Sequence, residues 1–141
     1  MIRLLTIDDY DDICRLWKNT PGLGLNGLDD SREGILRFLL RNPASNFVAV
    51  EDGRIVGTIL SGHDGRRGHI YHACVDTEYR RRRIGTKLVH QVINAMKEEN
   101  IHKLTLVALK NNDQGNDFWS RSGWMRRDDL NMYALSLEND N

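Results

Sequence analysis

Residues 75–88 read VDTEYRRRRIGTKL, and the fold of the whole chain is best approached from this stretch. Val75 ends a β-rich run, a polar turn with four consecutive arginines follows, and Leu88 begins the apolar stripe of a helix. The first turn of a helix has backbone N–H groups without intrahelical partners, and it carries the positive end of the helix dipole. A strand, a polar turn and a helix in succession are therefore typical of a site that holds an anion.

The side chains of this turn leave two interpretations open. Gly85 lets the backbone approach a ligand closely, and the arginines add charge-assisted donors suited to phosphate oxygens. A solvated basic turn, in which Gly85 serves only helix packing, explains the same residues. The local pattern alone leaves these two interpretations about even, because short motifs often match by chance.

The segments on either side of the turn predict an α+β fold. Apolar residues recur at helical spacing in three segments, and β-rich runs alternate with turn signals such as Glu51-Asp52-Gly53. We expect helices over Ile7–Lys18, between Ser31 and Pro43, from Gly85 to about Glu99, and over Asn116–Ser122. We expect strands over Ile2–Leu5, Phe47–Val50, Arg54–Leu60, His69–Val75, Lys103–Leu109 and Asn131–Leu137. This order fits one domain over residues 1–141, with a mixed, mostly antiparallel sheet and helices on both faces.

The charge balance argues against a general nucleic-acid binder. Lysine plus arginine and aspartate plus glutamate number 20 each, so the formal net charge is zero. Binding driven by counterion release needs a broad excess of positive charge. A nucleic-acid module that uses Arg66, Arg67, Arg126, Arg127 and the arginine turn stays as a hypothesis, and it predicts steeply salt-dependent binding.

Cysteine usage and hydropathy predict a cytoplasmic protein without a metal. Cys14 and Cys74 form neither a disulfide framework nor a paired zinc spacing. No stretch approaches the roughly 18 apolar residues that a membrane span needs. The N-terminal MIRLLTIDDYDD turns acidic at once and lacks the apolar core of a signal peptide.

Three motifs resemble those of the GNAT acetyltransferase superfamily. Residues 79–88, YRRRRIGTKL, resemble its acyl-CoA signature Q/R-x-x-G-x-G/A, with Arg80 at the first position and Gly85 at the last. Residues 52–57, DGRIVG, resemble the hairpin that leads into the third strand of that family. Asn112 followed by FWSRSGW at 118–124 resembles its N-x-x-A-x-x-F-Y-x-x-x-G-F segment. The resemblance covers nearly the whole chain, and the motifs stand in the family's order.

The resemblance implies a GNAT-like fold in which a splayed strand pair holds acyl-CoA. It implies an N-acetyltransferase that moves the acetyl group of acetyl-CoA to a primary amine of a small molecule or peptide by direct attack, as a monomer or homodimer. Pantetheine is expected along Ala73, Cys74 and Val75, and the remaining cofactor contacts are expected from Arg80, Arg81, Arg82, Arg83, Ile84, Gly85, Thr86, Asn112 and Trp119. For Asn112, a loop-capping role is an almost equal alternative.

Two positions depart from the family's pattern. Arg83 stands where the signature has its inner glycine, and we expect it to keep a negative φ, as residues at a helix start normally do. Trp119 stands where the family has a tyrosine thought to protonate the departing CoA thiolate. Because indole donates hydrogen bonds but is no useful acid at neutral pH, a non-catalytic acyl-CoA-binding module is the alternative function.

His69 is the first candidate for the base that removes the proton of the amine. Counting back from the turn puts it where histone-type members carry a glutamate, and an imidazole pKa near about 6.5 suits base catalysis at neutral pH. Tyr71 is the second catalytic candidate, because in a regular strand it shares the face of His69, whereas His72 and Cys74 lie on the other. A bulge would upset this assignment. The alternative is that His69 and His72 are ordinary strand residues, one half-exposed and one packed, and a packed thiol explains Cys74 better than a nucleophile does.

Overall fold

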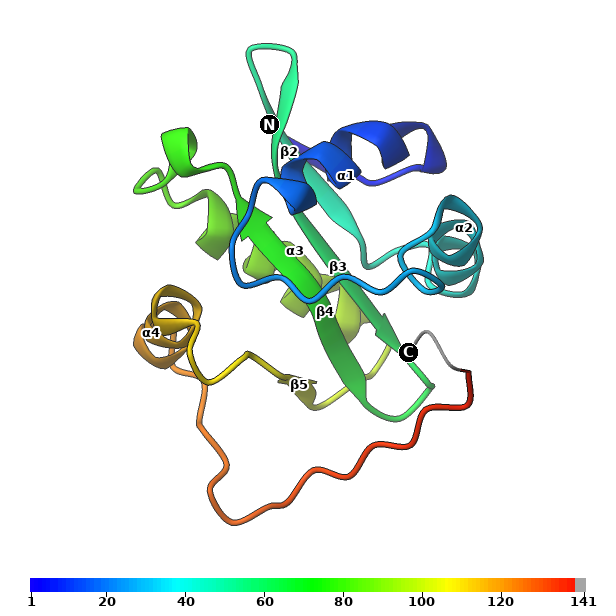
Figure 1. Ribbon diagram of the computed structural model, residues 1–141, viewed down its shortest axis with the longest axis vertical. Coiled ribbons are helices and arrows are strands. Elements are labelled where there is room, and N and C mark those ends of the chain that lie inside the picture. Colours follow the sequence, from blue (N-terminus) through cyan, green and yellow to red (C-terminus); the bar gives the residue numbers. More distant parts are fainter. Residues whose placement is uncertain (139–141) are drawn as a thin grey trace.

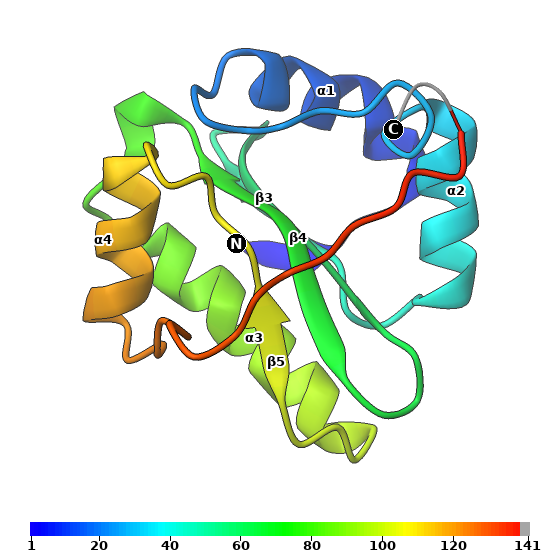
Figure 2. The same ribbon diagram turned by 60° about the horizontal axis from the view of Figure 1, so that its bottom comes forward.

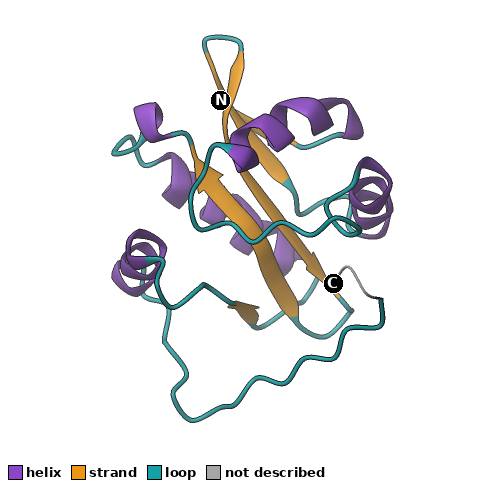
Figure 3. Ribbon diagram, in the orientation of Figure 1, coloured by secondary structure: helices purple, strands orange, loops and turns teal. Residues whose placement is uncertain are grey.

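The computed structural model describes residues 1–138, which form a five-stranded sheet in the order β1-β2-β3-β4-β5 (Figures 1 and 3). The strands are β1 (Ile2–Leu4), β2 (Phe47–Glu51), β3 (Arg54–His63), β4 (Gly68–Val75) and β5 (Leu104–Leu106). Neighbours pair antiparallel from β1 to β4, and β4 pairs parallel with β5. The mixed, mostly antiparallel sheet predicted from the sequence is confirmed.

Helices cover both faces of the sheet, as predicted. They are α1 (Tyr10–Lys18), α2 (Arg32–Arg41), α3 (Ile84–Glu98) and α4 (Asp113–Arg121), with two short 3-10 turns, η1 (Ile7–Asp9) and η2 (Thr77–Tyr79). Figure 1 shows α1 and α2 in front of the sheet and α3 behind it. Helix α4 begins at Asp113 rather than at Asn116, because the Asn112 side chain accepts a hydrogen bond from the Gly115 N–H at 3.0 Å and caps the helix.

Each face of the sheet has its own apolar core. Behind the sheet, the stripe of α3 packs on strand residues, and this core includes Val56, Ile59, Ile70, Leu88, Val92 and Met96. In front, α1 and α2 bury a second set against the sheet, which includes Ile13, Leu16, Trp17, Ile35, Leu60 and Cys74. The helical spacing seen in the sequence thus corresponds to the buried faces of these helices.

A β-bulge interrupts the pairing of β3 with β4. Leu60 pairs with His72 and Ser61 pairs with Ile70, so that Tyr71 has no partner on β3. The rings of Tyr71 and Phe38 of α2 meet edge-on at 5.4 Å, and those of His72 and Trp17 of α1 meet at 5.0 Å. Both side chains therefore lie on the front face. The alternation expected for a regular strand is wrong here, because the extra residue of a bulge shifts the side chains that follow to the other face.

Strands β4 and β5 pair over three residues and then separate. Gly68, His69 and Ile70 pair with Leu104, Thr105 and Leu106. Beyond Leu106 the chain turns away toward α4, so that β5 is shorter than the strand predicted over Lys103–Leu109 (Figure 2). We call the space between residues 71–75 of β4 and residues 107–112 the β4–β5 gap. This separation is the splayed strand pair that the sequence predicts.

The closing strand predicted over Asn131–Leu137 is wrong. The structure has neither helix nor strand after Ser122 among the residues it describes, and Figure 3 draws this part as a long trace. Tyr133 and Leu135 are 89% and 86% exposed. Alternating apolar residues form a strand only where a neighbouring strand supplies hydrogen-bond partners. The segment forms no ladder with β5, and its pattern is therefore not realised as a strand.

A cluster of buried polar side chains ties the end of α2 to β3 beside the bulge. Asn46 accepts a hydrogen bond from the Ser61 N–H at 2.8 Å and donates one to the Asn42 carbonyl at 2.8 Å. Ser45 donates to the Ser61 carbonyl at 2.7 Å, and His63 donates its N–H to Asn42 Oδ1 at 3.0 Å. β3 extends beyond β2 here, so these side chains replace the missing strand neighbour.

Replacement of Asn46 by alanine is expected to lower the free energy of unfolding by about 2 kcal/mol, because the Ser61 N–H and the Asn42 carbonyl lose their buried partner. Equilibrium denaturation measures the change. Asn111→Ala, at an exposed position of the same residue type, is the matched control and should change stability by less than about 0.5 kcal/mol. Equal effects of the two substitutions would contradict the proposed role of the cluster.

Candidate functional site

Backbone groups of β4 face the β4–β5 gap at alternate residues. Asp76 donates its N–H to the Val56 carbonyl at 2.7 Å, and Cys74 lies opposite Thr58 on β3. Because hydrogen bonding alternates along an antiparallel strand, the N–H and C=O groups of Cys74 point to β3, whereas those of Ala73 and Val75 point to the gap. Of the three residues predicted to contact pantetheine, only Ala73 and Val75 thus offer backbone groups there.

Cys74 is a packed thiol. Its side chain is buried in the front core, and burial raises the pKa of the thiol to about 12, against a smaller opposing effect of a hydrogen bond with Thr20. A thiol with that pKa supplies almost no thiolate at neutral pH. The geometry therefore supports the structural role expected for Cys74 over a nucleophilic one.

The arginine turn contains two residues in the left-handed region. Arg81 has φ +68° and Arg83 has φ +62° with ψ +19°. The expectation that Arg83 keeps a negative φ is wrong. The turn keeps the backbone path that a glycine would allow, although each left-handed side-chain residue costs about 1–2 kcal/mol. Turns that include left-handed residues often direct successive N–H groups into one concave surface, which attracts anions.

The start of α3 adds backbone N–H groups beside this turn. Arg83 is the N-cap residue of α3, and its side chain forms no capping hydrogen bond. The N–H groups of Ile84, Gly85 and Thr86, the first three residues of the helix, therefore have no intrahelical acceptor. A Cβ atom at Gly85 would lie 3.3 Å from the Phe118 ring of α4, so Gly85 also permits close packing of α3 on α4.

The four arginine side chains differ in their surroundings. Arg80 spans the mouth of the gap, where its Nε donates to the Val75 carbonyl at 3.3 Å and its Nη1 donates to Gln114 of α4. Arg81, Arg82 and Arg83 are exposed, and none forms an ion pair within residues 1–138. The Arg82 guanidinium lies 5.0 Å from the centre of the Tyr79 ring. Three guanidinium groups thus remain available to an anion at this turn.

Helix α4 supplies the other side of the gap. Asn112 caps α4 and contacts the segment between α1 and α2, since a Cβ atom at Gly22 would lie 3.1 Å from its side chain. Trp119 is half-buried, and its ring packs edge-on against Phe118 at 4.9 Å and Trp124 at 5.0 Å. The structure shows Asn112 in the capping role that was the alternative to a contact with the cofactor.

His69 lies in the paired part of β4 and not along the gap. Its Nδ1 is 2.9 Å from Thr105 Oγ1 of β5, and its ring meets that of Tyr71 edge-on at 4.6 Å. Burial lowers the pKa of His69, so the imidazole is neutral at neutral pH. The structure brings the two predicted catalytic side chains together, but it holds His69 away from Ala73 and Val75.

A second histidine, which the sequence did not single out as a base, is paired with a carboxylate. His72 Nε2 lies 2.8 Å from Asp30 Oδ1, and both side chains are 12% exposed. Asp30 belongs to residues 19–31, the segment that crosses the front of β3 and β4 in Figure 1. The two residues are separated by 42 positions, so no local pattern relates them.

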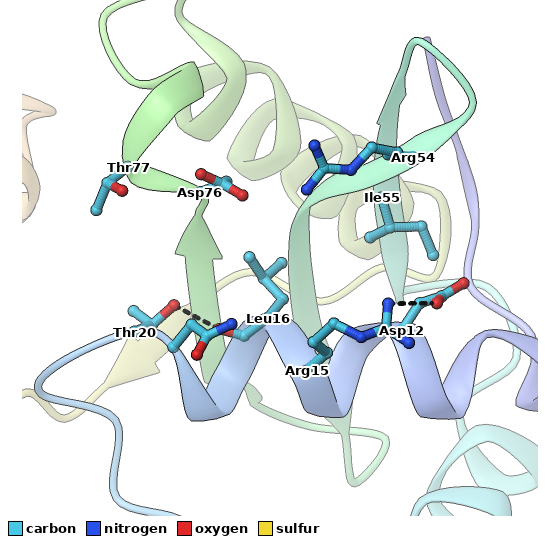
Figure 4. Close-up of a pocket in the computed structure, with 9 residues that line it drawn as sticks. Asp12, Arg15, Leu16, Thr20, Arg54, Ile55, Asp76 and Thr77 are labelled. Carbon is cyan, nitrogen blue, oxygen red and sulfur yellow. Dashed lines mark hydrogen bonds and ion pairs between the residues drawn. The ribbon is translucent and has the colours of Figure 1, made fainter.

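Two surface hollows flank α1. One is lined by Asp12, Arg15, Leu16, Asn19, Thr20, Arg54, Ile55, Asp76 and Thr77 (Figure 4). Its Arg15–Asp12 ion pair, 2.9 Å, joins two side chains that are more than half exposed, and we assign it no role. The other hollow lies between α1 and the 19–31 segment, and Tyr10, Cys14, Trp17, Leu25 and Asp30 are among its lining residues. Of the His72–Asp30 pair, Asp30 lines this hollow.

Two classes of site are not found among the described residues. Within residues 1–138, no three or more His, Cys, Asp or Glu side chains are grouped so that they could hold a metal ion. In the same part of the chain, no helix combines the length and the apolar character needed to cross a membrane.

Comparison with known proteins gives concordant matches. Residues 10–124 match the model of the acetyltransferase (GNAT) family. An acetyltransferase of Photorhabdus laumondii is 31% identical over 116 residues, which cover 79% of this chain and 77% of that protein. Ard1 from Thermoplasma volcanium matches the fold with a TM-score of 0.77 at 22% identity, over 87% of this chain and 80% of that one. PaiA N-acetyltransferase from Thermoplasma acidophilum, solved in complex with coenzyme A, has a TM-score of 0.75 at 19% identity, over 87% of each chain.

Replacement of Arg83 by glycine is expected to raise the free energy of unfolding by about 1 kcal/mol, because glycine adopts the left-handed conformation without steric cost. Equilibrium denaturation measures the gain. Arg82→Gly is the matched control, since Arg82 is not among the residues with positive φ and should lose stability on becoming glycine. A loss of stability in Arg83→Gly would contradict the strain described for this turn.

Proposed function

The chain belongs to the acetyltransferase (GNAT) family, and from this premise we propose that it transfers an acetyl group from acetyl-CoA to a primary amine of a small molecule or peptide. The family uses acyl-CoA donors and amine acceptors. Three points are our proposals for this chain. The group transferred is acetyl, the acceptor is a primary amine of a small molecule or peptide, and the amine attacks the thioester directly.

One observation carries the proposal: the β4–β5 gap ends at the arginine turn. Ala73 and Val75 offer backbone hydrogen-bond groups along the gap, which suit the amides of pantetheine. The turn at Arg81–Arg83 and the first N–H groups of α3 offer donors and positive charge for a pyrophosphate. The residues present therefore fit the two chemically distinct parts of CoA, in the order in which they are joined.

The proposed reaction needs a neutral amine and a polarised carbonyl. Acetyl-CoA supplies an activated thioester, whose carbonyl carbon the amine nitrogen attacks. A lysine-like amine has a pKa of about 10.4, so a base must remove its proton at neutral pH. An N–H group of β4 that faces the gap, such as that of Ala73, is suited to donate to the carbonyl oxygen as its negative charge develops.

Exchange of Arg82 for glutamate is expected to weaken acetyl-CoA binding by about 10- to 100-fold, because an exposed guanidinium near the proposed pyrophosphate site is replaced by a carboxylate. Isothermal titration calorimetry with acetyl-CoA and with CoA measures the affinity. Arg66→Glu, an equal charge change at the exposed β3–β4 hairpin, is the control and should leave affinity within about threefold at moderate salt. Failure of the unmodified protein to bind either molecule would refute the proposed function.

Trp119 favours a second candidate, an acyl-CoA-binding module without turnover. The tyrosine expected at this position would supply a proton to the leaving thiolate, and an indole does not do so at neutral pH. Thiol release from acetyl-CoA across a panel of primary amines separates the two functions. Turnover with any amine supports the transferase, whereas binding without turnover on every acceptor supports the module.

If turnover occurs, Trp119→Phe is expected to keep kcat within about threefold, because the indole N–H is not the source of the thiolate's proton. Phenylalanine retains an aromatic ring that can pack against Phe118 and Trp124. Steady-state kinetics with the best amine measures the effect, and unchanged acetyl-CoA affinity controls for the packing. A loss of about 100-fold in kcat with intact affinity would show that the indole takes part in the reaction.

A further inference from the structure

We infer that His72 is the proton acceptor for the amine and that Asp30 is the positioning residue that holds its imidazole. This inference rests on the proposed acetyl transfer, which it deepens by assigning the base. It replaces His69, the candidate that the sequence suggested.

His72 lies on the part of β4 that has no partner on β5. The last pair of β4 with β5 joins Ile70 to Leu106, so His72 is the second residue along the part of β4 that borders the gap. The next residue is Ala73, whose backbone groups face the gap. The side chain of His72 projects to the front face, where it meets Trp17 and Asp30, and these two residues line the hollow between α1 and the 19–31 segment. An acceptor bound in this hollow would lie against the two residues that contact the imidazole.

The bulge at Tyr71 precedes His72 directly. Its extra residue is left out of the ladder, and both Tyr71 and His72 contact helices of the front face. His69 is held on Thr105 in the paired part of the strand. Between the two histidines, only His72 thus combines a place along the gap with a carboxylate partner.

Asp30 is itself held on both sides. Its Oδ2 accepts the Asn26 N–H at 2.7 Å, which leaves Oδ1 directed at His72 Nε2. The backbone carbonyl of Asp30 accepts the Tyr10 hydroxyl at 2.7 Å, which ties this part of the segment to α1. An ionised carboxylate accepts hydrogen bonds only, so Nε2 must carry a proton. The neutral imidazole then has its free electron pair on Nδ1, which has no hydrogen-bond partner within residues 1–138.

Two other titratable groups lie close to the His72–Asp30 pair, and both are uncharged at neutral pH. From α1, Tyr10 lies next to Asp30, and burial together with a Cys14 hydrogen bond raises the pKa of Tyr10 to about 12. From β4, Cys74 lies on the same face, and burial raises the pKa of its thiol to about 12. Both groups are neutral at neutral pH. Within residues 1–138, the charged group that a hydrogen bond places against His72 is Asp30.

Acetyl transfer with His72 as the base balances in protons and electrons. The substrate ammonium gives one proton to Nδ1 of His72 and becomes a neutral amine. Its nitrogen forms the C–N bond to the thioester carbonyl carbon, and the C–S bond breaks. The second proton of the nitrogen neutralises the departing CoA thiolate, and His72 returns its proton to water. Asp30 stays ionised throughout, as the carboxylate does in other carboxylate–histidine pairs.

The test compares His72→Gln and Asp30→Asn with the unmodified protein, and uses His69→Gln as the matched comparison. We expect His72→Gln to lower kcat/KM for the amine by about 100-fold at pH 7. The unmodified protein should show a rising limb governed by an imidazole and then a plateau. In His72→Gln the rate should instead rise up to the amine's own pKa of about 10.4. His69→Gln should keep the imidazole limb.

Two measurements separate a proton-transfer role from a purely structural one. Asparagine at position 30 can still hydrogen-bond to His72, so Asp30→Asn should keep acetyl-CoA affinity and thermal stability while kcat falls.

Each outcome decides one question. Turnover that keeps its magnitude and pH profile in His72→Gln would overturn the assignment and leave the acetyl transfer intact. Loss of the imidazole limb in His69→Gln alone would assign the base to His69. Absence of turnover in the unmodified protein with every amine would refute the transferase, and the assignment with it. If His72→Gln fails to fold, an Asp30→Asn variant that keeps the kcat of the unmodified protein still overturns the positioning role of Asp30.

Discussion

The separation of β4 from β5 after Ile70 is the constraint on which the rest of the structure depends. A strand that loses its neighbour must find other partners for its backbone groups. At Val75 the Arg80 side chain supplies one such partner. The other groups that face the gap are those to which we propose that acyl-CoA binds. The arginine turn, the start of α3 and α4 surround this opening, and the 19–31 segment crosses the sheet in front of it. The candidate site thus follows from a local failure of strand pairing.

Much of the fold was predictable, because it depends on local periodicity. The stripe from Leu88 to Met96 marks the buried face of α3, and Glu51-Asp52-Gly53 marks the β2–β3 hairpin. The strand over Asn131–Leu137 was not realised, because a strand also needs a partner, which local sequence does not supply. The pairing of His72 with Asp30 could not be predicted from the local sequence either. It depends on a bulge at Tyr71 and on a segment that returns across 42 residues.

At Arg83 the turn keeps the backbone conformation of the signature, although the glycine of the signature is replaced. The signature has a glycine at this position, and the sequence suggested that the arginine would adopt an ordinary backbone angle. The structure keeps the glycine-like angle and accepts the steric cost. The packing of Gly85 against Phe118 and the start of α3 at Ile84 leave the turn little freedom to relax. Backbone geometry is thus retained here more strictly than side-chain identity.

The short β4–β5 ladder also bears on how the molecule loses its structure. Three residue pairs join β5 to the sheet, whereas the hairpin of β3 with β4 is paired along most of its length. Regions with few such ties open at a lower free energy than the core does. A molecule bound along the gap would bridge β4 to the elements beyond β5, and it would thereby protect the chain after Leu106 from proteases. The acyl donor would then act both as a substrate and as a link that joins the last quarter of the chain to the remainder.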